Sequence, residues 1–225
     1  MRSLTIDVGN TRTKVALFVD GVMQGCREYD GCTLPAFDCA IASVTGKRPD
    51  WLPQGCLELS ASLNLPITVA YATPQTLGPD RVAAASAAWD MFHKPVVVID
   101  AGTCITVDYV DHGGIYRGGA ILPGLEMKFR ALHNFTARLP LLHISNAVCD
   151  AEPIGRDTCG SIVSGVLCAT RYALKGYVGE LSGKAGCSVE VVVTGGDACH
   201  LAGEWIVEPD LVMRGLDKIL MMNKQ

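Results

Sequence analysis

The sequence predicts an α/β protein made of two related domains with a cleft between them. The first observation is an internal repeat: residues 6–11 (IDVGNT) return as residues 99–104 (IDAGTC), roughly ninety residues later. The second is that short β-branched runs alternate with helical stretches along the chain. This alternation favours mostly parallel sheets with helices packed on their faces. Because each copy of the repeat follows one β-rich run and leads into another, we expect a duplicated α/β unit.

The first copy of the repeat opens a predicted hairpin. Residues 4–6 and 14–19 are apolar runs typical of strands, and Asp20-Gly21 then supplies a turn signal. Further along this half, we expect buried strands at residues 39–44 and 67–71 and an alanine-rich helix at residues 81–92.

The second copy opens a similar hairpin. Residues 96–99 and 105–110 are its strand-like runs, and a turn signal follows at residues 112–114 (HGG). Residues 139–150 fit neither a helical nor a strand period. The remaining elements are expected at residues 115–122 (strand), 124–132 (helix), 158–177 (helix), 189–193 (strand) and 211–222 (amphipathic helix).

The domain boundary is predicted near residue 94, where the second half begins without a flexible linker. This gives an N-terminal domain at residues 1–94 and a C-terminal domain at residues 95–225. The terminal helix is expected to pack back on the first domain.

Charge and composition exclude several classes of function. The chain has 19 Lys+Arg against 23 Asp+Glu, so it lacks the positive field that generic binding to nucleic acid needs. Its long uncharged stretch at residues 59–79 is broken by polar residues and prolines, so we expect no membrane span and a cytoplasmic location. The ten cysteines contain no Cys-x-x-Cys pair, and we interpret most of them as reduced thiols packed as small hydrophobes.

Asp7, Gly9, Asn10, Thr11 and Lys14 form the first candidate site. A glycine turn at a strand end offers backbone N–H groups to phosphate oxygens, while an acid beside it faces a hydrated cation and a lysine adds positive charge. The alternative is an ordinary β-hairpin, because Asp, Gly and Asn favour turns in any case.

Asp100, Gly102 and Thr103 repeat that arrangement, and residues 194–197 (TGGD) add a third strand-end glycine turn. Two facing acid-glycine turns would bracket a triphosphate, and the third suits a close approach of backbone to a nucleotide. The chain has neither the Walker nor the Rossmann glycine motif. The pattern instead resembles the actin, hexokinase and Hsp70 type of ATPase, which has ribonuclease H-like domains.

Within that superfamily, the chain resembles the type III pantothenate kinases nearly end to end. The matching segments are residues 7–14, Tyr71, residues 78–81 (GPDR), 100–103 (DAGT), 118–125 (GGAILPGL) and 136–140 (TARLP), Thr158, residues 164–165 (SG) and residues 194–197.

The resemblance implies ATP-dependent phosphorylation of pantothenate to 4'-phosphopantothenate, the first step of coenzyme A biosynthesis. It implies that Asp80 is the catalytic proton acceptor, a role that suits a carboxylate near an alcohol nucleophile. It also implies contacts with pantothenate by Tyr71, Gly78, Pro79, Asp80, Arg81 and Thr158.

The resemblance further implies how the nucleotide and cations bind. Thr103 is expected to contact ATP, together with the turn formed by Asp7, Gly9, Asn10, Thr11 and Lys14. Asp100 is expected to bind a monovalent cation, K⁺ or NH₄⁺. Mg²⁺ is expected with ATP, with Asp7 as its candidate ligand, and the family implies a homodimer.

Other interpretations stay open at this point. Asp80 and Thr158 each stand where a helix cap is expected, and Arg81 would serve equally well in a structural ion pair. The whole chain would also fit a non-enzymatic regulatory relative of the family, or a kinase of the same superfamily that acts on another small molecule.

Overall fold

The computed structural model describes residues 1–60, 62–146 and 151–224. The chain divides into two compact units. Unit 1 comprises Met1–Val96, Asp108–Gly118 and Asp210–Gln225, and unit 2 comprises Val97–Val107 and Gly119–Pro209. The domain boundary near residue 94 stays a prediction.

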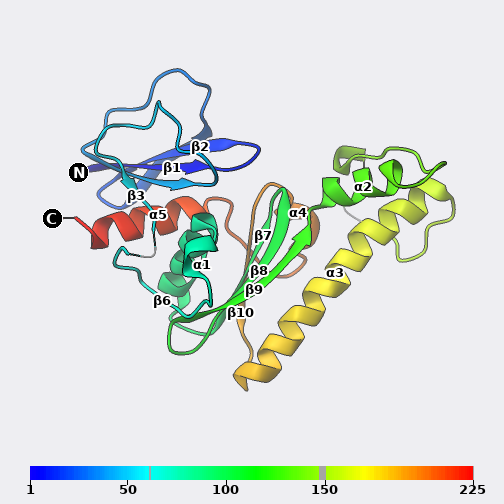
Figure 1. Ribbon diagram of the computed structural model, residues 1–225. Helices are drawn as coiled ribbons and strands as arrows, with labels where there is room; N and C mark the ends of the chain where they lie inside the picture. The colour runs from blue at the N-terminus through cyan, green and yellow to red at the C-terminus, as the bar shows by residue number, and fades with distance from the viewer. Residues whose placement is uncertain (61, 147–150, 225) are drawn as a thin grey trace. The chain divides into compact units, whose positions relative to one another are not determined.

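Unit 1 contains a five-stranded sheet in the order β3-β2-β1-β4-β5 (Figure 1). Strand β1 pairs antiparallel with β2 and parallel with β4. The sheet is therefore mixed: β4 also pairs parallel with β5, as the sequence predicted, while the hairpins β1–β2 and β2–β3 place neighbours antiparallel. The strands are β1 (Arg2–Val8), β2 (Thr13–Val19), β3 (Val22–Glu28), β4 (Cys39–Val44) and β5 (Leu57–Glu58).

The turn between β2 and β3 confirms the predicted turn signal. Asp20 and Gly21 both have positive φ, at 50° and 77°, as a two-residue hairpin turn requires. Strand β3 itself was not predicted, because its sequence, VMQGCRE, has no continuous apolar run and is mostly exposed.

Two helices of unit 1 pack against each other, and the second also packs on β1 (Figure 1). They are α1 (Pro79–Phe92) and α5 (Leu211–Met222). Gly215 permits the close approach, because a Cβ at this position would clash with the backbone carbonyl of Ala83. The buried Ser3 hydroxyl of β1 donates to the Asp217 carboxylate of α5. The helices and sheet of unit 1 therefore share one core.

The second sheet has the order β11-β10-β7-β8-β9-β6. The predicted second hairpin corresponds to neighbouring strands β7 and β8, and the residues from Val96 to Ile99 are fully buried. The strands are β6 (Thr68–Val69), β7 (Val96–Ala101), β8 (Cys104–Val110), β9 (Ile115–Pro123), β10 (Glu190–Thr194) and β11 (Ile206–Val207).

The remaining helices include the long α3, which extends eight residues beyond its predicted end at Tyr177. Asp157 caps its N-terminus, and Gly186 ends it in the left-handed conformation. In the described ranges, no helix is both long and apolar enough to cross a membrane. The helices are α2 (Leu125–Asn134), α3 (Thr158–Ala185), α4 (Ala198–Leu201) and the short 3-10 turns η1 (Pro74–Thr76) and η2 (Ile144–Asn146).

The cysteines differ from expectation in one respect. All nine that lie within the described residues are free thiols, as predicted, but five are exposed and do not pack as small hydrophobes. Cys149 lies outside the described residues, as do residues 147–150 of the segment that had no predicted period. The exposed cysteines are Cys32, Cys104, Cys159, Cys187 and Cys199.

Candidate active site

Asp7 lies near the end of β1, between two polar neighbours on adjacent strands. The sheet register pairs it with Lys14 of β2 and with Ser43 of β4. Burial raises the pKa of Asp7 to about 6; the Ser43 hydroxyl and Lys14 lower it, while the charge of Asp80 raises it further. Even so, Asp7 Oδ1 and Ser43 Oγ are buried without a hydrogen-bond partner of ordinary geometry in the described part of the chain. A buried, unsatisfied carboxylate oxygen of this kind suits a cation.

The turn after Asp7 is tight. The Gly9 N–H donates to the Arg12 carbonyl at 3.0 Å, and a Cβ on Gly9 would lie 3.1 Å from the same oxygen. Asn10 and Thr11 at its tip are exposed. The predicted phosphate-binding turn therefore forms a compact loop whose polar side chains face solvent.

Asp80 lies in the first turn of α1, and its suggested role as the helix cap is wrong. The cap position belongs to Gly78, and Pro79 follows as the first helical residue. Asp80 Oδ1 accepts the backbone N–H of Arg81 at 2.9 Å. Burial raises the pKa of Asp80 and the charge of Asp108 adds to this rise, whereas the amide and side chain of Arg81 lower it. Asp80 thus combines a fixed position with raised basicity.

Arg81 forms a buried ion pair with Asp108, which is the alternative role that the sequence analysis gave for it. Its Nε donates to both carboxylate oxygens of Asp108, at 3.0 and 3.2 Å, and its Nη2 donates to Oδ1 at 2.5 Å. The Tyr116 hydroxyl donates to the same Oδ1 at 2.6 Å. Burial alone would lower the pKa of Arg81, but its hydrogen bonds to Asp108 and the charge of Asp108 outweigh this and raise it. The guanidinium is therefore held in one orientation.

Tyr71 lies beside this pair. Its ring centroid is 6.2 Å from that of Tyr116, and the side chain of Tyr71 also supports the charge of Arg81. Gly118, at φ 99°, approaches the ring so closely that an added Cβ would lie 3.4 Å from it. Unit 1 therefore brings Tyr71, Asp80 and Arg81 into one neighbourhood.

Asp100 and Thr103 belong to unit 2, at the turn between β7 and β8. Gly195, at φ 92°, lies so close that a Cβ would be 2.5 Å from Asp100 Oδ1. The Asp197 N–H donates to the Ala101 carbonyl at 2.9 Å. The third glycine turn therefore packs directly against the Asp100 turn, a contact that requires glycine.

Thr158, also in unit 2, is the first residue of α3, so its suggested role as a cap is wrong: Asp157 is the cap and accepts the Gly160 N–H at 2.7 Å. Thr158 lines an open pocket of about 620 Å³ together with Leu132, Leu139, Arg156 and other residues near the helix start. This pocket combines apolar walls with a charged guanidinium.

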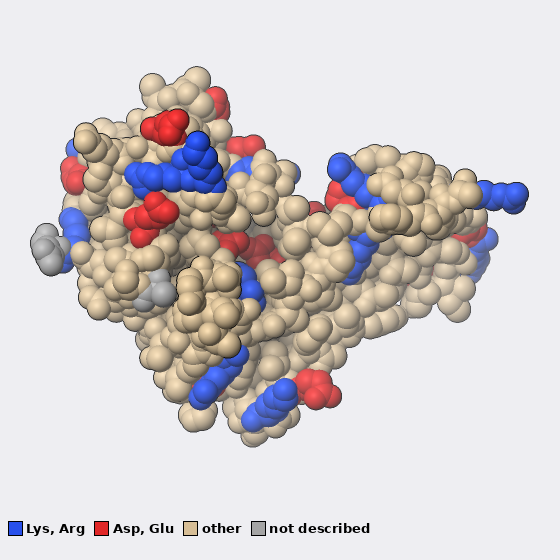
Figure 2. Space-filling model, viewed as in Figure 1, with Lys and Arg blue, Asp and Glu red and all other residues tan. Residues whose placement is uncertain are grey.

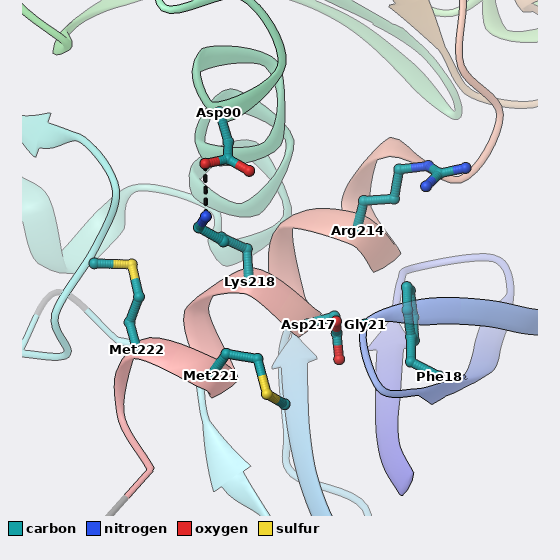
Figure 3. A pocket seen from close by; sticks show the side chains of 8 residues that line it. All are labelled: Phe18, Gly21, Asp90, Arg214, Asp217, Lys218, Met221 and Met222. Atoms are coloured by element: carbon teal, nitrogen blue, oxygen red, sulfur yellow. Dashed lines mark ion pairs between the residues drawn. The ribbon is translucent and has the colours of Figure 1, made fainter. Parts of the chain in front are cut away.

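Charged side chains are scattered on the face drawn in Figure 2, where acidic and basic groups alternate among neutral ones. A separate cavity of about 460 Å³ in unit 1 is lined partly by α5. Figure 3 shows Asp90 and Lys218 there, joined by an ion pair at 2.7 Å. The other acid in its wall, Asp217, accepts from Ser3. None of the residues that line this cavity is a predicted site residue.

Comparison with known proteins decides the family. Residues 3–180 match the model of type III pantothenate kinase. The chain is 37% identical to the type III pantothenate kinase of Bacteroides fragilis (strain YCH46) and 36% identical to that of Phocaeicola vulgatus, with 98% of both chains covered each time. The chain belongs to the type III pantothenate kinase family.

Solved structures agree on the fold of this family member. One neighbour, with a TM-score of 0.68 and 23% identity over 98% of both chains, is described as a Baf family transcriptional activator from Campylobacter jejuni. Another is a ROK family glucokinase from Streptomyces griseus, with a TM-score of 0.51 and 12% identity over 99% of both chains. At these identities the likeness shows the fold alone, which is the two-domain actin- and hexokinase-like ATPase fold predicted from the sequence.

Three residues that lie beside the candidate site residues were missed by sequence reasoning: Ser43, Asp108 and Tyr116. Each lies inside a strand: sheet register places Ser43 beside Asp7, whereas Asp108 reaches Arg81 from β8 to helix α1 and Tyr116 bonds to Asp108. The one available signal was Asp108, an acid within a run of β-branched residues, since a buried charge needs a partner.

Proposed function

We propose that this protein transfers the γ-phosphoryl group of ATP to the primary hydroxyl of pantothenate, giving 4'-phosphopantothenate and ADP in the first step of coenzyme A biosynthesis. Family membership supports the reaction. The geometry that carries the assignment is Asp80, a partly buried carboxylate with raised pKa at the start of α1.

Asp80 is the proposed proton acceptor. As the pantothenate oxygen forms its bond to the γ-phosphorus, the bond from that phosphorus to the bridging oxygen of ADP breaks, and the hydroxyl proton passes to Asp80. A raised pKa makes the carboxylate a better proton acceptor. The rest of the proposed pantothenate site comprises Tyr71, Gly78, Pro79, Arg81 and Thr158.

Asp7 is the proposed ligand of Mg²⁺, directly or through water. Its unsatisfied buried Oδ1 fits a cation, and a bound cation would offset its costly charge. When bound, Mg²⁺ supplies charge neutralisation on the triphosphate. Asp100 is the proposed ligand of K⁺ or NH₄⁺ because its carboxylate is an oxygen donor enclosed by glycine backbone. The proposed ATP contacts are Gly9, Asn10, Thr11, Lys14 and Thr103.

A homodimer is also proposed. Unit 2 exposes several large apolar side chains, among them Ile121, Phe135, Ile154 and Tyr172, and a second copy of the chain would cover such residues. Light scattering should then give twice the 23.9 kDa chain mass, and a monomeric mass would contradict the dimer. We further propose a cytoplasmic location, because the nine described free thiols suit a reducing compartment.

ADP release by the purified protein, with and without pantothenate, tests the reaction. In potassium buffer we expect turnover that depends on pantothenate, and in sodium buffer we expect much slower turnover. ADP release that does not respond to pantothenate would overturn the proposal. Pantothenate-dependent turnover that is equal in both buffers would contradict only the proposed requirement for a monovalent cation.

A further inference from the structure

The Arg81 guanidinium forms its ion pair with Asp108. Arg81 is 8% exposed, Asp108 1% and Tyr116 0%, so the three polar groups satisfy one another away from solvent. The Tyr116 hydroxyl bonds to the same Asp108 oxygen that receives two N–H groups from Arg81. A buried carboxylate with three donors on one oxygen has little freedom to move.

This arrangement affects the neighbouring carboxylate. Asp80 precedes Arg81 in the chain and its pKa responds to the charge of Arg81, yet the Arg81 guanidinium forms its ion pair with Asp108. If Asp108 were neutral, the buried guanidinium would be left without a counter-charge. Asp80 would then be the carboxylate beside it, and pairing would be strongly favoured.

We propose that Asp108, held by Tyr116, is a positioning residue of the kinase reaction: by binding the Arg81 guanidinium it keeps the Asp80 carboxylate available to the substrate hydroxyl. The inference rests on the proposed function, because it takes Asp80 as the acceptor of the hydroxyl proton. Asp108 acts only through Arg81 and Asp80.

Steady-state kinetics of three variants test this role. Asp108→Asn should lower kcat about 100-fold, because the Asp80 carboxylate would then pair with Arg81 and no longer be available as the proton acceptor. Tyr116→Phe, which removes only one hydrogen bond to Asp108, should lower kcat roughly threefold. Adding Arg81→Met to Asp108→Asn removes the competing guanidinium, so kcat should recover at least about tenfold even if the KM for pantothenate rises.

Asp217→Asn is the matched control, because Asp217 is another buried carboxylate of unit 1 and accepts a hydrogen bond from a hydroxyl group, that of Ser3. The kcat of Asp217→Asn should stay within about twofold of wild type, although this variant should lose about as much stability as Asp108→Asn. A double variant no faster than Asp108→Asn would overturn the proposal, because a purely structural role predicts no rescue. So would a control that loses as much kcat as Asp108→Asn.

A crystal structure of Asp108→Asn separates this proposal from the proposed function. The Arg81 guanidinium should turn to the Asp80 carboxylate, whether or not the wild-type protein phosphorylates pantothenate. If Arg81 keeps its wild-type orientation, the positioning role is wrong. If wild type shows no pantothenate-dependent turnover, the proposed function fails, and the crystal structure alone decides the role of Asp108.

Discussion

Two carboxylates of unit 1, Asp7 and Asp80, have raised pKa values. In each, burial raises the pKa by more than the neighbouring hydrogen bonds and positive charges lower it. The charge of Asp80 also contributes to the raised pKa of Asp7. Burial makes the charge of both carboxylates unfavourable, and in the proposed function bound cations would offset it. Function and stability therefore oppose each other at these residues.

Asp7→Asn tests this opposition through pH dependence. Native Asp7 takes up its proton near pH 6, and the unfolded chain does so only near the ordinary value of 3.8. The native state thus binds more protons between these values, so the contribution of Asp7 to the unfolding free energy falls as the pH rises through this window. In cation-free buffer, Asp7→Asn should exceed wild type by up to about 3 kcal/mol at about pH 8 and match it below about pH 4.

Urea unfolding at these two pH values measures the difference. Asp38→Asn serves as the control of opposite sign, because a backbone hydrogen bond from Arg2 lowers the pKa of Asp38. That variant should lose stability at the higher pH. A loss at Asp7→Asn as well would show that its charge is stabilised rather than strained in the native state.

Single residues could be predicted only where they stand at turns or helix starts. Asp7, Asp80 and Arg81 follow recognisable glycine or proline signals. Ser43, Asp108 and Tyr116 sit inside strands, and which side chains meet there depends on pairing register. Propensity also favoured Asp80 and Thr158 as caps, whereas Gly78 and Asp157 hold those positions.

At the scale of elements, the contact between α1 and α5 joins the end of the chain to the helix that carries Asp80. Alanines on α1 and Gly215 on α5 keep the two backbones close. Gly215→Ala should destabilise the protein by about 3 kcal/mol, because the new methyl group meets the backbone carbonyl of Ala83 rather than a movable side chain.

Gly179→Ala is the matched helical control for that change. Gly179 lies within α3 and an added Cβ would have nothing within 4 Å. This variant should gain roughly 0.5–1 kcal/mol from helix propensity alone. Thermal melting of both variants gives the comparison, and equal stabilities would contradict the tight packing at Gly215.

Elements with strong periodicity were predicted well. Strand β4 and helix α5 have the predicted bounds, since each is an uninterrupted apolar pattern between clear breaks. Strand β3 was missed because it is an exposed edge strand with little apolar content. Local sequence carries no strong signal for this strand, because β3 is stabilised by pairing with β2.

For the whole molecule, the internal repeat predicted the architecture. Its two copies form the hairpin β1–β2 and the neighbouring strands β7 and β8, and the solved structures agree on an actin- and hexokinase-like fold. The expected parallel pairing is found for β1 with β4, β4 with β5, β6 with β9 and β10 with β11, whereas β2 pairs antiparallel with β1 and β3. Asp7 in unit 1 and Asp100 in unit 2 occupy matching positions of the repeat, whereas Asp80 lies outside it.

The central claim is that Asp80 accepts the proton of pantothenate as the γ-phosphoryl group of ATP is transferred. Mass spectrometry of the product, for wild type and Asp80→Asn under the same potassium and magnesium conditions, tests it most directly. Wild type should form 4'-phosphopantothenate, and Asp80→Asn should form it at least about 100-fold more slowly while melting at a similar temperature. Formation of 4'-phosphopantothenate at near wild-type rates by Asp80→Asn would contradict the claim.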